Sequence, residues 1–328
     1  MRLGFIVTQM AHLKYQIPLM LEGKRRGLDS TVFIYKSGKY HCPYRYKKEL
    51  EGLGRQYGFD IKEISDISDF HNNIVFLIEG SLVERVPDSN KKISLAIAWD
   101  FINTYDQYIH KVDLTIFPSK SVARDINVIP DKTLYLGSPK YDIKLDKDTI
   151  RNKYNITTDK NALFIHPNFH GLKQVCGHKD INISRIHGHL RKMGFTVIVK
   201  ARGKAPAPDN QKGDKYIEDF SWFPHDTMEL IEISDIVIIL GSVTAKECIM
   251  LNKPFVNFAI ALKPVLFTYL YDYDYCRLMD MDIQLDEFKN SIDKLLSIDH
   301  TEAFLKARKD HLFESGNVSA KILDKVLS

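Results

Sequence analysis

The chain has 328 residues, of which 44% are hydrophobic and 27% are charged. This ordinary globular composition excludes a disordered, collagen-like or coiled-coil protein. The length predicts two domains of about 150 residues, each large enough to bury a core without disulfides. Lys and Arg number 46 and Asp and Glu number 42, which gives a net charge of +4. That mild excess permits an anionic ligand but does not indicate a nucleic-acid-binding protein.

The cysteines and the apolar runs indicate a reduced, soluble protein. The four cysteines are scattered without CxxC spacing, and Cys248 lies in an apolar stretch typical of a small buried residue. The longest apolar run, at 236–240, is far too short to span a membrane, and the first ten residues lack the features of a signal peptide. We therefore expect a cytoplasmic protein.

In the first half of the chain, short apolar runs alternate with helix-length amphipathic stretches. A helix is predicted at 13–26, where it ends at Gly27. Strands are predicted at 3–8, 31–35, 74–78, 94–98 and 114–117. These strands are apolar throughout, as in parallel sheets that helices cover on both faces.

A break at Gly137-Ser138-Pro139, followed by a charged segment to residue 159, predicts a hinge. A loop is predicted at 203–215, and a second series of strands at 162–166, 195–200, 235–240 and 254–258. The pattern predicts an α/β protein of two Rossmann-like domains facing a cleft. Their predicted bounds are 1–140 and 141–300, with a closing helix at 301–328. Ligands of such folds bind at the carboxyl ends of strands, where the strand order reverses.

One strand-turn-helix segment carries the strongest functional signal. An apolar strand led by Asp235 is followed by the turn Gly241-Ser242-Val243 and then by a helix that contains Glu247. Backbone N–H groups at such a turn, together with the positive end of the helix dipole, suit a phosphate. The Glu247 carboxylate would then accept hydrogen bonds from a ribose diol. The same pattern also occurs as an ordinary turn followed by a solvated glutamate.

This segment resembles the C-terminal half of the GT-B nucleotide-sugar transferases, in particular the CDP-glycerol glycerophosphotransferase and UDP-N-acetylglucosamine 2-epimerase branches. The shared pattern continues past the glutamate to an apolar residue and Lys253-Pro254. Weaker similarities are LGSPKYD at 136–142, ALFIHPNF at 162–169 and TVIVKAR at 196–202. The turn lacks the acidic residue that the family often has there, and no His-Gly-Thr-like segment occurs in the first half. The resemblance implies a GT-B-like fold whose C-terminal domain binds a nucleotide-diphosphate donor.

Further donor-binding residues are expected at the ends of the neighbouring strands. Lys200 and Arg202 alternate with Ala201, so both are predicted to face the cleft and neutralise a diphosphate, although both also fit a solvated strand terminus. His166 or His170 is predicted to face the phosphates. The other histidines of 166–189, His187 and His189 among them, are expected at the surface, because their spacing matches no zinc site. No metal and no cofactor are predicted.

On the acceptor side, a general base is expected after a strand of the first domain. His12 follows the first predicted strand, and its ordinary pKa suits a base. Asp100 follows the segment SLAIAW, which contains the strand at 94–98, and is the competing candidate, although aspartate there also caps a helix. Glu79 is a third carboxylate at a strand end.

A basic, tyrosine-rich stretch at 36–55 is a candidate acceptor-binding loop. It interleaves positive charge with aromatic rings, which suits a sugar, an anionic polymer or a nucleobase. The same residues also fit an exposed basic helix. The acceptor-binding candidates are Lys39, Tyr40, Tyr44 and Arg45.

Taken together, the sequence predicts a metal-independent transferase. It would move a glycosyl or glycerophosphate-like group from a nucleotide-diphosphate donor to an acceptor hydroxyl. The acceptor stays open between a glycan, an anionic polymer and a nucleic acid. Two alternatives keep the fold: a nonhydrolysing sugar-nucleotide epimerase, and a non-catalytic protein that binds nucleic acid or carbohydrate.

Overall fold

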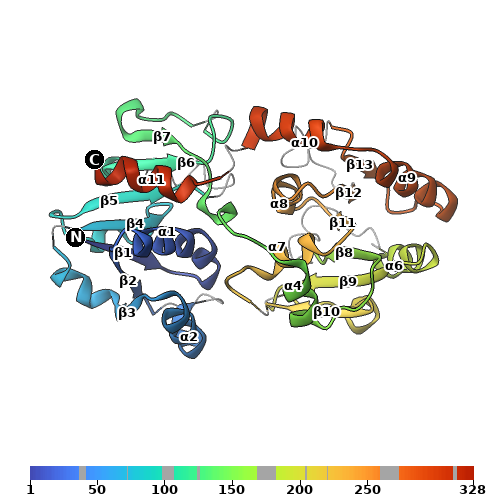
Figure 1. The fold of residues 1–328 in the computed structure, drawn as a ribbon, viewed down its shortest axis with the longest axis horizontal. Coiled ribbons are helices and arrows are strands. Elements are labelled where there is room, and N and C mark those ends of the chain that lie inside the picture. The colour runs from blue at the N-terminus through green and yellow to red at the C-terminus, as the bar shows by residue number, and fades with distance from the viewer. Residues whose placement is uncertain are drawn as a thin grey trace. The chain divides into compact units, whose positions relative to one another are not determined.

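The computed structural model describes residues 1–36, 42–71, 73–97, 107–123, 126–167, 182–203, 205–219, 221–258, 273–312 and 316–328. The chain divides into two compact units. In Figure 1 the first unit runs from blue to green and includes the red C-terminal helix, and the second runs from green to red-orange. Met1–Ile143 and Lys309–Ser328 form the first unit, and Lys144–Arg308 form the second. Within the described residues, no helix has both the length and the apolar character needed to cross a bilayer.

The first unit is built on a sheet of seven parallel strands in the order β3-β2-β1-β4-β5-β6-β7. Its strands are β1 (Arg2–Val7), β2 (Asp29–Ile34), β3 (Asp60–Glu63), β4 (Ile74–Ile78), β5 (Lys91–Leu95), β6 (Leu114–Phe117) and β7 (Thr133–Tyr135). Its α-helices are α1 (Leu13–Arg25), α2 (Lys47–Tyr57) and α11 (Val318–Leu327). The strand order reverses between β1 and β4, so the crevice expected of this topology lies beside their carboxyl ends.

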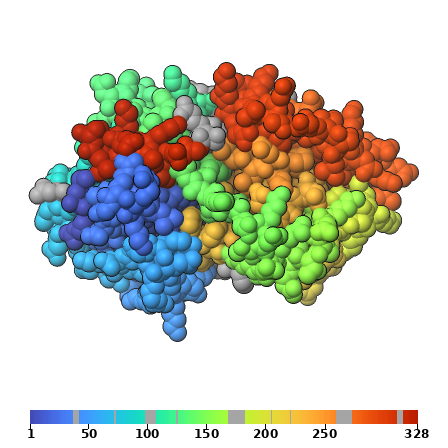
Figure 2. Space-filling view, in the orientation of Figure 1, coloured from blue at the N-terminus to red at the C-terminus, as the bar shows by residue number. Residues whose placement is uncertain are grey.

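The C-terminal helix α11 packs on α1 within the first unit, and Figure 2 shows the last residues, in red, against the blue N-terminal part. The carboxylate of Asp142 accepts hydrogen bonds from the backbone N–H groups of Val318 and Ser319, so it caps α11 from a distant part of the chain. The Arg26 guanidinium donates to Asp324 at 2.6 Å. Asp142 is the last residue of the LGSPKYD motif, and its role here is to fix the returning helix.

The second unit is built on a sheet of six parallel strands in the order β10-β9-β8-β11-β12-β13. Its strands are β8 (Asn161–Ile165), β9 (Thr196–Ala201), β10 (Lys215–Glu218), β11 (Ile236–Ile239), β12 (Phe255–Phe258) and β13 (Cys276–Met279). Its α-helices are α4 (Lys147–Tyr154), α6 (Ile183–Lys192), α7 (Asp226–Glu232), α8 (Thr244–Met250), α9 (Leu285–Ser297) and α10 (Thr301–Ala307). The order reverses between β8 and β11. The two parallel sheets with their helices confirm the predicted α/β fold of two Rossmann-like domains.

Helices α4 and α7 are joined by a buried polar contact. The Glu229 carboxylate of α7 accepts hydrogen bonds from Lys153 Nζ at 2.6 and 2.9 Å and from the Tyr154 hydroxyl at 2.6 Å. Burial and the adjacent carboxylate raise the pKa of Tyr154, so the hydroxyl keeps its proton and remains a donor. The cluster fixes the two helices against each other.

The core of the second unit contains a histidine, His187 of α6. Within the described part of the chain, neither ring nitrogen has a hydrogen-bond partner, and the ring lies edge-on to Phe164 with 4.7 Å between centroids. Burial lowers the pKa of His187 to about 4. The predicted surface position of His187 and His189 is wrong, because both are buried on the inner face of α6.

We expect His187 to make the protein less stable as the pH falls from about 6.5 towards 4. The unfolded chain takes up a proton near pH 6.5, whereas the folded chain keeps His187 neutral down to about pH 4. At about pH 5 this difference costs about 2 kcal/mol of unfolding free energy. Urea unfolding should therefore show that the unfolding free energy falls less between about pH 7.5 and pH 5 for His187→Leu than for the wild type. The pH dependence would not come from His187 if the wild type and His187→Leu lost equal amounts of unfolding free energy. The same conclusion would follow if His71→Leu, at an exposed site, reduced the loss as much as His187→Leu does.

Candidate functional site

The carboxyl edge of the second sheet brings together several of the predicted donor-binding residues. His166 follows β8, and the turn Gly241-Ser242-Val243 follows β11, so both lie where the strand order reverses. Lys200 lies near the end of β9, next to β8. These residues therefore lie at one edge of the sheet, as expected from their positions at the ends of parallel strands. Their roles depend on local geometry.

The turn after β11 presents backbone N–H groups. Gly241 has φ of +60°, a left-handed conformation that favours glycine. Its N–H donates to Asn257 Oδ1 at 2.8 Å, and the Thr244 N–H donates to Ser242 Oγ at 3.2 Å. Between them, the N–H groups of Ser242 and Val243 have no hydrogen-bond partner among the described residues. Consecutive backbone N–H groups of this kind form a concavity that suits an anion.

Glu247 lies in the helix that follows the turn. Helix α8 has only 7 residues, so the turn's own N–H groups, rather than the dipole of a long helix, are its main attraction for a phosphate. Glu247 is 6% exposed, so it is not the solvated helix residue of the alternative interpretation. A carboxylate can accept hydrogen bonds from both hydroxyls of a ribose diol.

His166 is buried at the end of β8. Its backbone N–H donates to the Lys200 carbonyl at 2.9 Å, and its Nε2 lies 3.0 Å from Gln211 Oε1. Burial lowers the pKa of His166, so the ring is neutral at pH 7. At that pH His166 can offer hydrogen bonds to a ligand but no positive charge.

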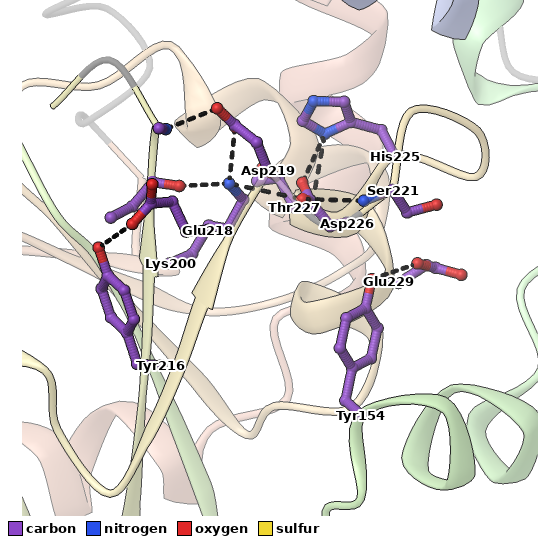
Figure 3. A network of polar contacts seen from close by, with 12 residues as sticks. Tyr154, Lys200, Tyr216, Glu218, Asp219, Ser221, His225, Asp226, Thr227 and Glu229 are labelled. Carbon is purple, nitrogen blue, oxygen red and sulfur yellow. Dashed lines mark hydrogen bonds and ion pairs between the residues drawn. The ribbon is translucent and has the colours of Figure 1, made fainter. Parts of the chain in front are cut away.

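Lys200 lies at the centre of a buried ion cluster (Figure 3). Its Nζ is 3.3 Å from Asp219 Oδ1 and 3.5 Å from Asp226 Oδ2, and it also donates to the Ala201 carbonyl. Lys200 is 4% exposed, and Asp226 at the start of α7 is 1% exposed. Two carboxylates therefore already balance this ammonium group. Arg202, two residues further along, is exposed and remains the more accessible cation.

The first unit has a crevice of about 500 Å³ where its own strand order reverses. Its lining includes Thr8, His12, Glu79, Gly80, Gln107 and Tyr108. His12 ends a short 3-10 turn before α1, is 8% exposed, and has Nδ1 3.4 Å from Thr8 Oγ1. The crevice therefore contains a histidine and a carboxylate, a set that suits proton transfer.

The backbone at the end of β4 is tightly constrained around this crevice. Glu79 has φ of +50° and Gly80 has φ of +65°. A Cβ atom on Gly80 would lie 2.1 Å from the Tyr108 ring, so only glycine fits. The Glu79 carboxylate accepts a hydrogen bond from the Ile97 N–H at 3.3 Å. Non-glycine residues at positive φ cost about 1–3 kcal/mol and cluster at functional sites.

The remaining predicted residues divide between described and undescribed segments. Asp100, Lys39, Tyr40 and His170 lie outside the described residues. Tyr44 and Arg45 form part of the short turn Pro43–Tyr46 before α2, with Lys36 Nζ 5.6 Å from the centroid of the Tyr44 ring.

Cys248 is fully buried, which confirms its prediction as a small core residue. No group of three or more His, Cys, Asp or Glu residues among the described ranges has an arrangement that would hold a metal ion.

Three polar residues of the edge were missed by the sequence analysis: Asn257, Asp219 and Asp226. Asn257 carried a readable signal, since it is the one polar residue within the apolar strand PFVNF. The two aspartates carried none, because their pairing with Lys200 joins segments that only the folded sheet brings together.

No protein-family model matches the chain, and no curated protein sequence is significantly similar to it. Solved structures do share its fold. The wall teichoic acid polymerase TagF matches with a TM-score of 0.69 at 13% identity, over 99% of this chain and 88% of that one. A putative UDP-N-acetylglucosamine 2-epimerase from Listeria monocytogenes matches with a TM-score of 0.62 at 11% identity, over 100% of this chain and 96% of that one.

A third structure, the glycotransferase of kitacinnamycin, matches with a TM-score of 0.51 at 9% identity over 93% of each chain. Identities this low establish the fold alone. That fold is the GT-B fold, found in both of the branches that the sequence resembles. The GT-B-like architecture predicted from the sequence is thereby confirmed.

Proposed function

We propose that the protein is a transferase that uses a nucleotide-diphosphate donor. The observation that carries this proposal is the turn at 241–243, whose Ser242 and Val243 N–H groups are unpaired in the described structure at the switch point of a GT-B-like sheet. These groups would bind the donor diphosphate, with Arg202 as a further cation. Glu247 would accept hydrogen bonds from the ribose hydroxyls.

The acceptor hydroxyl would bind in the crevice of the first unit. His12 or Asp100 would remove its proton while the oxygen attacks the activated carbon or phosphorus of the donor. The bond to the leaving nucleoside diphosphate breaks as the new bond forms, and the N–H groups of the turn stabilise the negative charge that develops on it. Because backbone dipoles and Arg202 carry out this task, the proposed reaction needs no metal ion. Lys200 stays a proposed donor ligand that would act from within its ion cluster.

Thermal-shift measurements with UDP-, CDP-, GDP- and TDP-linked donors test the proposal, because a ligand that binds only the folded state raises the Tm. TagF was also solved after soaks with CDPG, which makes CDP-linked donors the first to try. A protein whose Tm none of these donors raises is not the proposed transferase.

We expect Glu247→Gln and Glu247→Ala to lose the donor-induced rise in Tm. Each hydrogen bond from a ribose hydroxyl to a carboxylate is worth about 1.5–3 kcal/mol, so the Kd should rise at least tenfold. Glu247→Gln keeps the shape of the buried side chain, and it should therefore unfold near the wild-type Tm without ligand. Glu232→Ala, at a partly exposed position of α7, serves as the control. An unchanged shift in Glu247→Gln would remove the ribose contact from the proposal.

A second candidate, a nonhydrolysing sugar-nucleotide epimerase, is favoured by the carboxylate of Glu79 beside His12 in one crevice. Release of free nucleotide only in the presence of an acceptor would distinguish a transferase from this epimerase. The non-catalytic alternative predicts instead a steep salt dependence of nucleic-acid binding and no nucleotide binding.

A further inference from the structure

A fully buried asparagine, Asn257 of β12, holds the turn after β11. The rest of this strand is apolar, and Asn257 itself is 0% exposed. Its Oδ1 accepts the Gly241 N–H at 2.8 Å. In the sheet Asn257 lies beside Ile239, two residues before Gly241, so its side chain reaches the turn from the neighbouring strand.

The other half of the carboxamide makes no contribution to the hydrogen bonds of the described residues. Asn257 Nδ2 is buried and has no hydrogen-bond partner within the described ranges. A buried donor without a partner costs about 1–3 kcal/mol, as much as the single bond at Oδ1 returns. Leucine has a similar volume and would fill this site without that cost. Stability alone therefore does not explain an asparagine at position 257.

The hydrogen bond from the Gly241 N–H to Asn257 restrains the backbone conformation of Gly241, which orients the turn. Glycine adopts positive and negative φ with similar ease, so nothing intrinsic keeps Gly241 at +60°. The unpaired N–H groups of Ser242 and Val243 follow directly, and their directions depend on the dihedral angles of Gly241. By holding the Gly241 N–H, Asn257 holds both of these groups in the arrangement that an anion needs.

We propose that Asn257 is a positioning residue for the donor diphosphate, acting through Gly241. This inference rests on the proposed function, because it assigns the turn to a diphosphate. It goes beyond that function by naming the residue that keeps the turn ready before the ligand arrives. Such preorganisation removes an ordering cost that binding would otherwise have to meet.

The test measures the Kd of inorganic pyrophosphate and of CDP for the wild type and for Asn257→Leu by titration calorimetry. We expect both Kd values to rise at least tenfold in Asn257→Leu, while the urea midpoint of the unliganded variant stays equal or increases. Pyrophosphate reports on the phosphate-binding groups without the contribution of Glu247, since it lacks a base and a ribose. Should Asn257→Leu fail to fold, Asn257→Ala removes the same oxygen without adding bulk, and the same rise is expected.

Asn161 provides a matched control at the opposite end of the same sheet. It is also 0% exposed, but its Nδ2 donates to the Thr158 carbonyl at 2.8 Å and to the Ile233 carbonyl at 3.4 Å. Asn161→Leu should therefore lower the urea midpoint and leave both Kd values unchanged. If Asn257 had only a structural role, Asn257→Leu would likewise lower the urea midpoint and leave both Kd values unchanged.

The double variant Gly241→Ala/Asn257→Leu tests whether Asn257 acts through the turn. If it does, the double variant binds pyrophosphate no more weakly than the weaker of the two single variants. If the losses of pyrophosphate-binding free energy in the two single variants add fully in the double variant, Asn257 does not act through Gly241. Wild-type protein that binds neither probe and none of the four kinds of nucleotide-linked donor would remove the proposed function and this inference together. Wild-type binding with an unchanged Kd in Asn257→Leu would overturn the positioning role alone.

Discussion

His12→Ala is expected to lower kcat of the proposed transferase by a factor of about 100 to 10,000, the usual contribution of a general base. The donor-induced rise in Tm should stay at its wild-type value, because His12 lies in the first unit and the donor turn lies in the second. Turnover with a saturating donor and the acceptor found by screening, together with thermal shift, measures both quantities.

A matched control for this variant is His71→Ala. His71 is exposed in the same unit, and the crevice lining does not include it. Its kcat should remain at the wild-type value. A normal kcat in His12→Ala with a large loss in Asp100→Asn would assign the base to Asp100 instead.

Lys200→Met is expected to destabilise the second unit by about 3–5 kcal/mol. The substitution removes the ammonium group that both carboxylates contact, and leaves the buried Asp226 and the partly buried Asp219 without that positive charge. Urea or guanidinium unfolding measures the change. Adding Asp226→Asn to Lys200→Met should recover part of the loss, because one of the uncompensated charges is then absent.

Lys212→Met is the control for this change. Lys212 pairs with Asp209, whose side chain is 96% exposed, and a surface pair of this kind contributes little to stability. A Lys200→Met protein that unfolds like the wild type yet no longer binds any nucleotide would contradict the structural role. That outcome would support Lys200 as a direct ligand of the donor phosphates.

The interior strands were predictable from the sequence, and the edge strands were not. Strands β1, β2, β4 and β6 of the first sheet and β8, β9, β11 and β12 of the second closely match the predicted apolar runs. Strand β5 (Lys91–Leu95) begins three residues before its predicted run at 94–98. The unpredicted strands β3, β7, β10 and β13 are the four outermost strands of the two sheets. An edge strand is short and partly exposed, so it carries polar residues, as in DIKE and KYIE, and lacks a continuous apolar signal.

The candidate site follows the same division. Residues that lie within a few positions after an apolar strand, such as His12, His166 and Gly241, could be located from the sequence, because parallel strands all end at one edge. The environment of Lys200 could not, since its partners Asp219 and Asp226 come from a loop and a helix start. Likewise, the surface prediction for His187 failed because it rested on the absence of a metal pattern, whereas the apolar face of α6 determines its burial.

The path of the chain through α11 has a consequence for synthesis. Residues 144–308 are translated as one uninterrupted stretch, so the whole sequence of the second unit is synthesised before residue 309 is added. Synthesis of the first unit begins earlier, yet Asp142 and α1 can make their contacts with α11 only after residues 318–327 have been synthesised. The part of the protein that is translated first is therefore the part completed last.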